Sequence, residues 1–198
     1  MKVAIHQPEH FPYMGFFQKL EASDVLIVLD NVKFKKNNFQ NRNKIKTSSG
    51  KDEWITVPVP KKSSSLKIKD IVVSQDGVWR QKLLKTIYQN FKFDASDIYS
   101  PSKLVDINMA SIKWAMNKMS LKRDIVFASD LQAEGSKSLL LANLVKEVGG
   151  TTYISGPSGK NYLDTSFFAD IQVEYFEPQV KNYYSCLYNL LAEGEQYE

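Results

Sequence analysis

The stretch VAIHQPEHFPYMGFFQKLEASDVLIVLD, residues 3–30, decides the fold. It opens with the apolar run Val3–Ile5, which is short enough for a buried strand. Aromatic and aliphatic residues then recur at helical spacing within Tyr13–Ala22, and a second apolar run, Val25–Leu29, ends at Asp30. A strand, a helix and a strand within about thirty residues predict a parallel βαβ unit.

The rest of the chain continues this alternation of strands and helices. Apolar spacing predicts further helices within 79–91, 105–119, 140–148 and 184–192, and strands at 125–127, 152–154 and 173–176. The sequence therefore predicts an α/β protein with a mostly parallel, Rossmann-like sheet and helices on both faces. Two further strand patterns, Trp54–Val59 and Ile68–Val73, are expected to pair as a small β-hairpin excursion. We expect residues 1–198 to form a single domain.

Composition limits the class of protein. The chain has 198 residues, of which 43% are hydrophobic and 24% charged, and this balance is typical of a globular domain. Cys186 is the only cysteine, which excludes an internal disulfide and favours a reducing compartment. No apolar run reaches the roughly 20 residues that a membrane helix needs. We therefore expect a cytoplasmic protein without membrane insertion.

Positive charge is concentrated in one region of the chain. The net charge of +4 is modest, but six lysines and an arginine lie between Lys33 and Lys51. Such a local field favours an anionic partner, here a phosphorylated small molecule. The alternative is a solvated loop surface, and the sequence alone leaves both open.

The segment after the first predicted strand combines polar residues with proline and glycine. His6 can act as an acid or base near neutral pH, and Gly15 allows close approach at a helix start, where backbone N–H groups attract phosphate. Gln7 and His10 are candidate ligand contacts beside them. A purely structural role for His6, as a strand cap, is the alternative. No metal site is predicted, because Pro8 lies between the two histidines and disfavours a shared helix face.

A second group of candidates follows the second predicted strand. Asp30 can bind a sugar hydroxyl, hold Mg²⁺ or serve as a base. Further along, six residues could bind a ligand through amide, guanidinium or ammonium groups: Lys35, Gln40, Asn41, Arg42, Asn43 and Lys44. A solvent-exposed turn is the other interpretation of this segment, because asparagine is common in turns.

A glycine-rich turn follows a later predicted strand. The stretch Ser155–Lys160 lacks the spacing of a phosphate-binding P-loop, since only two residues separate Gly156 from the Gly-Lys pair. Gly156 and Tyr162 remain candidate ligand contacts. There is no Gly-x-Ser-x-Gly motif and Cys186 has no nearby histidine, so a hydrolase triad finds no support.

The motifs as a set resemble the WbqC-like protein family. The resemblance is carried by HQP at residues 6–8, PYxGFF at 12–17, LDNVxF at 29–34 and QNRNKI at 40–45. Similar matches are TVPV at 56–59, YISG at 153–156, YLD at 162–164 and a closing Leu-Leu-x-x-Gly segment within 185–194. The resemblance implies a role connected with bacterial O-antigen and other surface-polysaccharide gene clusters.

These observations lead to one preferred hypothesis and two alternatives. The preferred function is group transfer onto a nucleotide-linked amino sugar, with His6 as acid or base, oriented by Asp30 or Gln7. Whether the protein is an enzyme stays open, because a non-catalytic nucleotide-sugar binding module would need the same ligand contacts. Nucleic-acid binding is disfavoured by the modest net charge. The cofactor is undetermined, with Mg²⁺ accompanying a nucleotide as the candidate, and the oligomeric state cannot be inferred.

Overall fold

The structure, a computed structural model, describes residues 1–192, so Gly194 of the closing motif lies outside the described part. The chain divides into two compact units, each assembled from separate stretches of sequence. Unit 1 comprises Met1–Gln7, Gly15–Asp30 and Lys122–Val180. Unit 2 comprises Pro8–Met14, Asn31–Leu121 and the described residues from Lys181 onward. The single-domain assignment stays a prediction.

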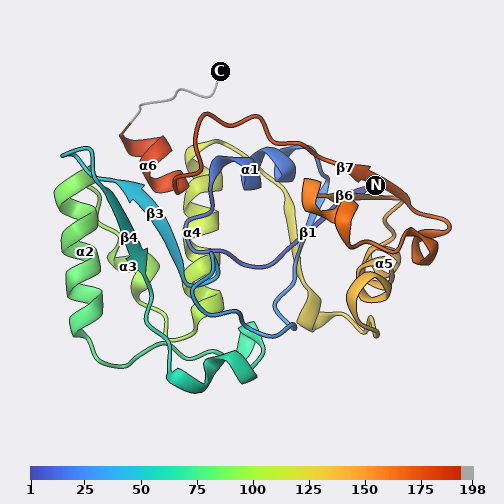
Figure 1. Cartoon of the computed structure of the whole chain (residues 1–198), viewed down its shortest axis with the longest axis horizontal. Helices are drawn as coiled ribbons and strands as arrows, with labels where there is room; N and C mark the ends of the chain where they lie inside the picture. The colour runs from blue at the N-terminus through green and yellow to red at the C-terminus, as the bar shows by residue number, and fades with distance from the viewer. Residues whose placement is uncertain (193–198) are drawn as a thin grey trace. The chain divides into compact units, whose positions relative to one another are not determined.

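Unit 1 is built on a five-stranded sheet. The strands are β1 (Lys2–His6), β2 (Val25–Val28), β5 (Asp124–Phe127), β6 (Thr152–Ser155) and β7 (Gln172–Tyr175). Their order in the sheet is β5-β2-β1-β6-β7, and every neighbouring pair is parallel (Figure 1). The expected parallel, Rossmann-like sheet is therefore confirmed.

Helices flank this sheet because its central strands are apolar on both sides. All four residues of β2 are buried, as are Val3, Ala4 and Ile5 of β1. The other elements of unit 1 are α1 (Met14–Glu21), α5 (Lys137–Glu147) and three short 3₁₀ helices, η3 (Ala128–Asp130), η4 (Pro157–Asn161) and η5 (Thr165–Phe168). Buried parallel strands of this kind need apolar cover on both faces.

Unit 2 combines helices with a two-stranded antiparallel sheet. Its strands are β3 (Arg42–Lys46) and β4 (Asp52–Thr56), and its α-helices are α2 (Val78–Phe91), α3 (Ser96–Tyr99), α4 (Leu104–Lys118) and α6 (Cys186–Leu191). Two 3₁₀ helices, η1 (Lys61–Ser65) and η2 (Ile68–Asp70), follow the hairpin. Within unit 2, helix α4 contributes many buried side chains, with Leu104, Ile107 and Ile112 fully enclosed.

The predicted hairpin is present, but one of its strands was assigned wrongly. β4 pairs with β3, not with residues 68–73. Residues 68–70 instead form η2, and Val72 makes only an isolated bridge to Lys103. Ile68 and Ile71 are both fully buried, and their spacing of three residues places them on one face of a 3₁₀ turn, whereas a strand would point them to opposite faces.

No helix among residues 1–192 is both long and apolar enough to cross a membrane.

Candidate functional site

The sheet of unit 1 has a point at which its connections reverse direction. β1 continues to β2 on one side, and β6 continues to β7 on the other. The β1–β6 ladder ends at Ala4 and Ile154, whereas the β1–β2 ladder runs on to His6 and the β6–β7 ladder to Ser155. In open parallel sheets, ligands bind outside the carboxyl ends of the strands at such a switch point. The candidate site is therefore the set of residues that end or follow β1 and β6.

His6 is the last residue of β1 and is held in one orientation. Its half-buried ring packs edge-on against Phe16, with the ring centroids 4.8 Å apart, and Nδ1 lies 2.9 Å from the Gln7 carbonyl oxygen. A carbonyl oxygen only accepts, so Nδ1 must carry the hydrogen and Nε2 the lone pair. Burial and the nearby charge of Lys19 lower the pKa of His6 to about 3. The imidazole is therefore neutral at physiological pH.

Lys19 is a site residue that the sequence analysis missed. Its side chain is only 7% exposed, and Nζ donates to the carbonyl oxygen of Ile5 at 3.1 Å. Lys19 follows Phe16 by three residues and precedes Leu20, which places it on the buried stripe of α1. A lysine on an apolar helical stripe was the signal that could have identified it.

The loop after β6 turns tightly next to the strand. Ser155 is fully buried and its hydroxyl donates to the Gly156 carbonyl oxygen at 3.1 Å. A Cβ added to Gly159 would lie 2.0 Å from the Ser155 Oγ, whereas one added to Gly156 would meet nothing within 4 Å. Gly159 is therefore required for close packing, and Gly156 leaves open space at the end of β6.

Gly159→Ala is expected to destabilise the protein by about 1–3 kcal/mol, because the new methyl group overpacks the Ser155 side chain. Urea unfolding would measure this loss. Gly156→Ala is the matched control and is expected to change stability by less than about 1 kcal/mol. Equal effects from the two substitutions would contradict the close packing assigned to Gly159.

Asp30 has both carboxylate oxygens engaged. Oδ1 accepts from the Ser129 backbone N–H at 3.0 Å, and Oδ2 accepts from the Ser129 hydroxyl at 2.7 Å. These bonds join the segments that follow β2 and β5. Among residues 1–192, no group of three or more His, Cys, Asp or Glu side chains could hold a metal ion. The catalytic and Mg²⁺-binding roles of Asp30 stay predictions.

In unit 2, the amide side chains of residues 40–43 hold backbone segments in place. Gln40, Asn41 and Asn43 are all at most 2% exposed. Their bonds are Lys35 N–H to Gln40 Oε1 at 2.8 Å, Asn41 Nδ2 to the Val57 oxygen at 3.1 Å and Asn43 Nδ2 to the Phe11 oxygen at 2.8 Å. This network gives the buried amides a structural role, and their part in ligand binding stays a prediction.

His10 lies in the interior of unit 2. It is fully buried, and its Nε2 lies 3.1 Å from the Tyr99 hydroxyl. Burial lowers the pKa of His10 to about 3. A ligand could reach this ring only after a rearrangement, so the predicted contact with ligand has no direct support in the geometry.

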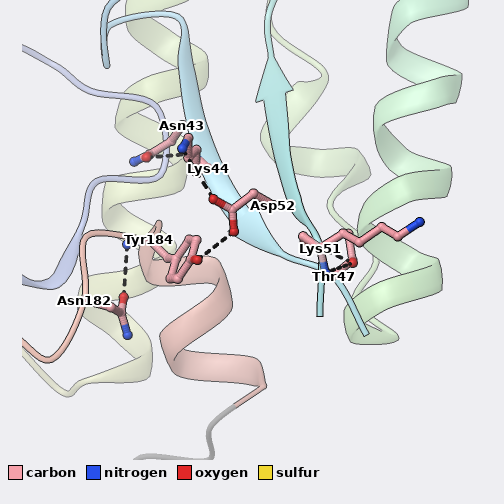
Figure 2. A network of polar contacts seen from close by, with 7 residues as sticks. All are labelled: Asn43, Lys44, Thr47, Lys51, Asp52, Asn182 and Tyr184. Carbon is pink, nitrogen blue, oxygen red and sulfur yellow. Dashed lines mark hydrogen bonds and ion pairs between the residues drawn. The ribbon is translucent and has the colours of Figure 1, made fainter. Parts of the chain in front are cut away.

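The hairpin of unit 2 presents cations beside an aromatic ring. The Arg42 guanidinium lies 4.3 Å from the centre of the Trp54 ring, and the Lys44 ammonium lies 5.4 Å from it. Figure 2 shows Asp52 between Lys44, at 3.4 Å, and the Tyr184 hydroxyl, at 2.6 Å. The bond from Tyr184, followed by those from Lys44, lowers the pKa of Asp52. Lys35 is exposed on the loop before this hairpin.

The predicted site residues fall into two groups. Those in unit 1 are His6, Gln7, Gly15, Asp30, Gly156 and the exposed Tyr162. Those in unit 2 are His10, Lys35, Gln40, Asn41, Arg42, Asn43 and Lys44. Gly15 lies in the first turn of α1. A single basic site that joins the two groups stays a prediction.

The chain is similar to known proteins over nearly its whole length. The model of the WbqC-like protein family matches residues 7–190. A relative described as "Uncharacterized protein Rv1507c", from Mycobacterium tuberculosis (strain ATCC 25618 / H37Rv), is 27% identical over an alignment covering 99% of this chain and 96% of the relative. No solved structure matches.

Proposed function

Because the chain belongs to the WbqC-like protein family, we propose that it transfers a group onto a nucleotide-linked amino sugar in bacterial surface-polysaccharide biosynthesis. The reaction is assigned to the switch point of the unit 1 sheet. The observation that carries this proposal is the neutral His6 at the end of β1, with Nδ1–H directed at the Gln7 carbonyl oxygen. A neutral imidazole in one tautomer is suited to accept a proton.

On this proposal, the sugar's amine or hydroxyl attacks the group that is transferred. A bond forms from the attacking nitrogen or oxygen to that group, and the bond between the group and its donor breaks, with its electron pair leaving on the donor. Nε2 of His6 accepts the proton released by the attacking atom. The Gln7 carbonyl oxygen, 2.9 Å from Nδ1, stabilises the imidazolium formed in this step.

Phosphate recognition is the second part of the proposal. Gly15 lies in the first turn of α1, where backbone N–H groups attract anions. In unit 2, Arg42, Lys44 and Lys35 are assigned to phosphate binding, which is supported by the cations that gather beside Trp54. Mg²⁺ bound together with the nucleotide remains the candidate cofactor.

The function is tested by identifying the ligand and the product. Protein purified from its own host is expected to carry a nucleotide sugar that native mass spectrometry identifies, and deletion of the gene is expected to remove one substituent from the surface polysaccharide. Restoring the intact gene is the control. An unchanged polysaccharide in the deletion strain would reject the proposed function.

The alternative is a binding module for the same ligand. A pKa of about 3 makes His6 a weak base in the ligand-free protein, and this observation favours binding without turnover. Tight binding of a nucleotide sugar, without conversion of any pathway intermediate, would support this alternative.

A further inference from the structure

A tryptophan lies on the outer face of the hairpin in unit 2. Side chains of a strand alternate between its two faces, and Asn43, Ile45 and Ile55 are buried on the inner face of the hairpin. Trp54 is paired with Lys44 across the two strands, so both lie on the outer face. Trp54 is 43% exposed. A large aromatic ring is thus turned toward solvent instead of packing in the core of unit 2.

The guanidinium of Arg42 lies beneath this ring. Its central carbon is over the face of the Trp54 indole, 4.3 Å from the ring centre. The Nε atom of Arg42 is closed off from solvent and has no hydrogen-bond partner among residues 1–192. Since Nε is enclosed while Trp54 is exposed, the guanidinium covers one face of the indole, and the opposite face is the one that solvent reaches.

Support of the tryptophan ring does not by itself account for an arginine at this position. A buried N–H donor without an acceptor lowers stability, and an apolar side chain at position 42 would carry the ring without that cost. Within the described residues, Arg42 also has no ion pair with a carboxylate. Its N–H donors are therefore left for an acceptor that a ligand supplies, and a planar guanidinium suits a phosphate.

The outer face of the hairpin carries further positive charge next to the ring. Arg42, Lys44 and Lys46 alternate along β3 and so lie on one face. The Lys44 ammonium is 5.4 Å from the centre of the Trp54 ring and 3.4 Å from Asp52, a carboxylate on the same face (Figure 2). An open aromatic face bordered by cations suits a ligand that combines a flat ring with phosphate groups, as a nucleotide does.

We propose that Trp54 stacks on the base of the nucleotide, while Arg42 and Lys44 donate to its phosphate oxygens. The proposal rests on the function proposed above and adds the residue that holds the base, for which that function names no group. Every base has a π face, so stacking recognises nucleotides as a class and does not select one base. A free phosphate would use the cations but would gain nothing from the ring.

The test compares nucleoside diphosphates with inorganic pyrophosphate, which has the two linked phosphates and no base, by calorimetric titration of the full chain. We expect the diphosphates of uridine, adenosine, guanosine and cytidine to bind more tightly than pyrophosphate. Trp54→Leu is expected to weaken their binding about 5- to 150-fold, the range for loss of one stacked base, and to leave pyrophosphate binding unchanged. Trp54→Phe keeps an aromatic ring and is expected to retain nucleotide binding within about 10-fold.

Tyr88→Leu is the matched control. Tyr88 is another exposed aromatic residue of unit 2, with the Lys92 ammonium 5.7 Å from its ring centre, and its loss is expected to leave nucleotide affinity unchanged. Wild-type nucleotide affinity in Trp54→Leu overturns the proposal. It is also overturned if none of the four nucleoside diphosphates binds the wild-type protein more tightly than pyrophosphate does. This second comparison needs no variant, so it decides even if Trp54→Leu does not fold.

The outcome is separable from that of the proposed function. Nucleotide binding that depends on Trp54, without any effect of gene deletion on the polysaccharide, would reject the group-transfer function and keep the nucleotide site. A changed polysaccharide in the deletion strain, together with nucleotide binding that does not depend on Trp54, would do the reverse.

Discussion

Replacing His6 by glutamine is expected to lower turnover about 10²- to 10⁴-fold, which is the range for loss of a general base. Glutamine has a similar size and can still form hydrogen bonds, but it cannot take a proton from the attacking group. Because the proposed phosphate contacts lie on other residues, nucleotide-sugar affinity is expected to stay within about 10-fold of wild type. Steady-state kinetics and calorimetric titration measure the two quantities separately.

The controls for this prediction concern folding and specificity. The urea midpoint of His6→Gln must stay near that of wild type, since the ring also packs on Phe16. Tyr88→Phe is a conservative change at an exposed residue of α2 and is expected to keep most of the activity. Undiminished turnover in His6→Gln would rule out His6 as the base.

Local patterns were sufficient to predict the parallel sheet. Val3–Ile5 and Val25–Leu29 are uninterrupted apolar runs, and such runs form strands that are buried on both faces. The first strand of the hairpin, β3, was harder to predict from the sequence. Its residues alternate between half-buried and buried, but one of the buried positions is the polar Asn43. A buried asparagine that bonds to backbone does not differ, in the sequence, from an exposed one in a turn.

The residues of the candidate site could be predicted only in part, because some of them depend on contacts between distant parts of the sequence. His6 and Gly156 could be identified because each lies at the end of an apolar run, and the ends of parallel strands share one edge. The order of the strands is set by contacts that are distant in sequence, so the switch point between β1 and β6 could not be predicted. The bond from Lys19 to the Ile5 oxygen depends on that order, because it forms where the β1–β6 ladder ends.

Acidification from pH 8 to pH 5 is expected to lower the free energy of unfolding by at most about 2 kcal/mol for each histidine. In the folded chain, the pKa of both His6 and His10 is about 3, below the value of 6.5 for an unperturbed histidine. Between these values the unfolded chain binds more protons, so stability falls as the pH falls. His10 is fully buried and is expected to contribute the whole effect, whereas the half-buried His6 contributes less.

The pH range separates this effect from that of the carboxylates, which take up protons mainly below pH 5. Urea unfolding at several pH values gives the slope of the free energy of unfolding against pH. The His10→Gln variant lacks one titrating group and is expected to reduce this slope by up to about 1.4 kcal/mol per pH unit. The absolute stability of this variant also changes, because Tyr99 loses its partner, but the slope reports protons alone. In the intact protein, neither imidazole NMR signal should titrate between pH 8 and pH 5. A histidine that titrates near pH 6.5 would show that its ring is solvated in the folded state, and for His6 this would also remove the reason to treat it as a neutral base enclosed beside Lys19.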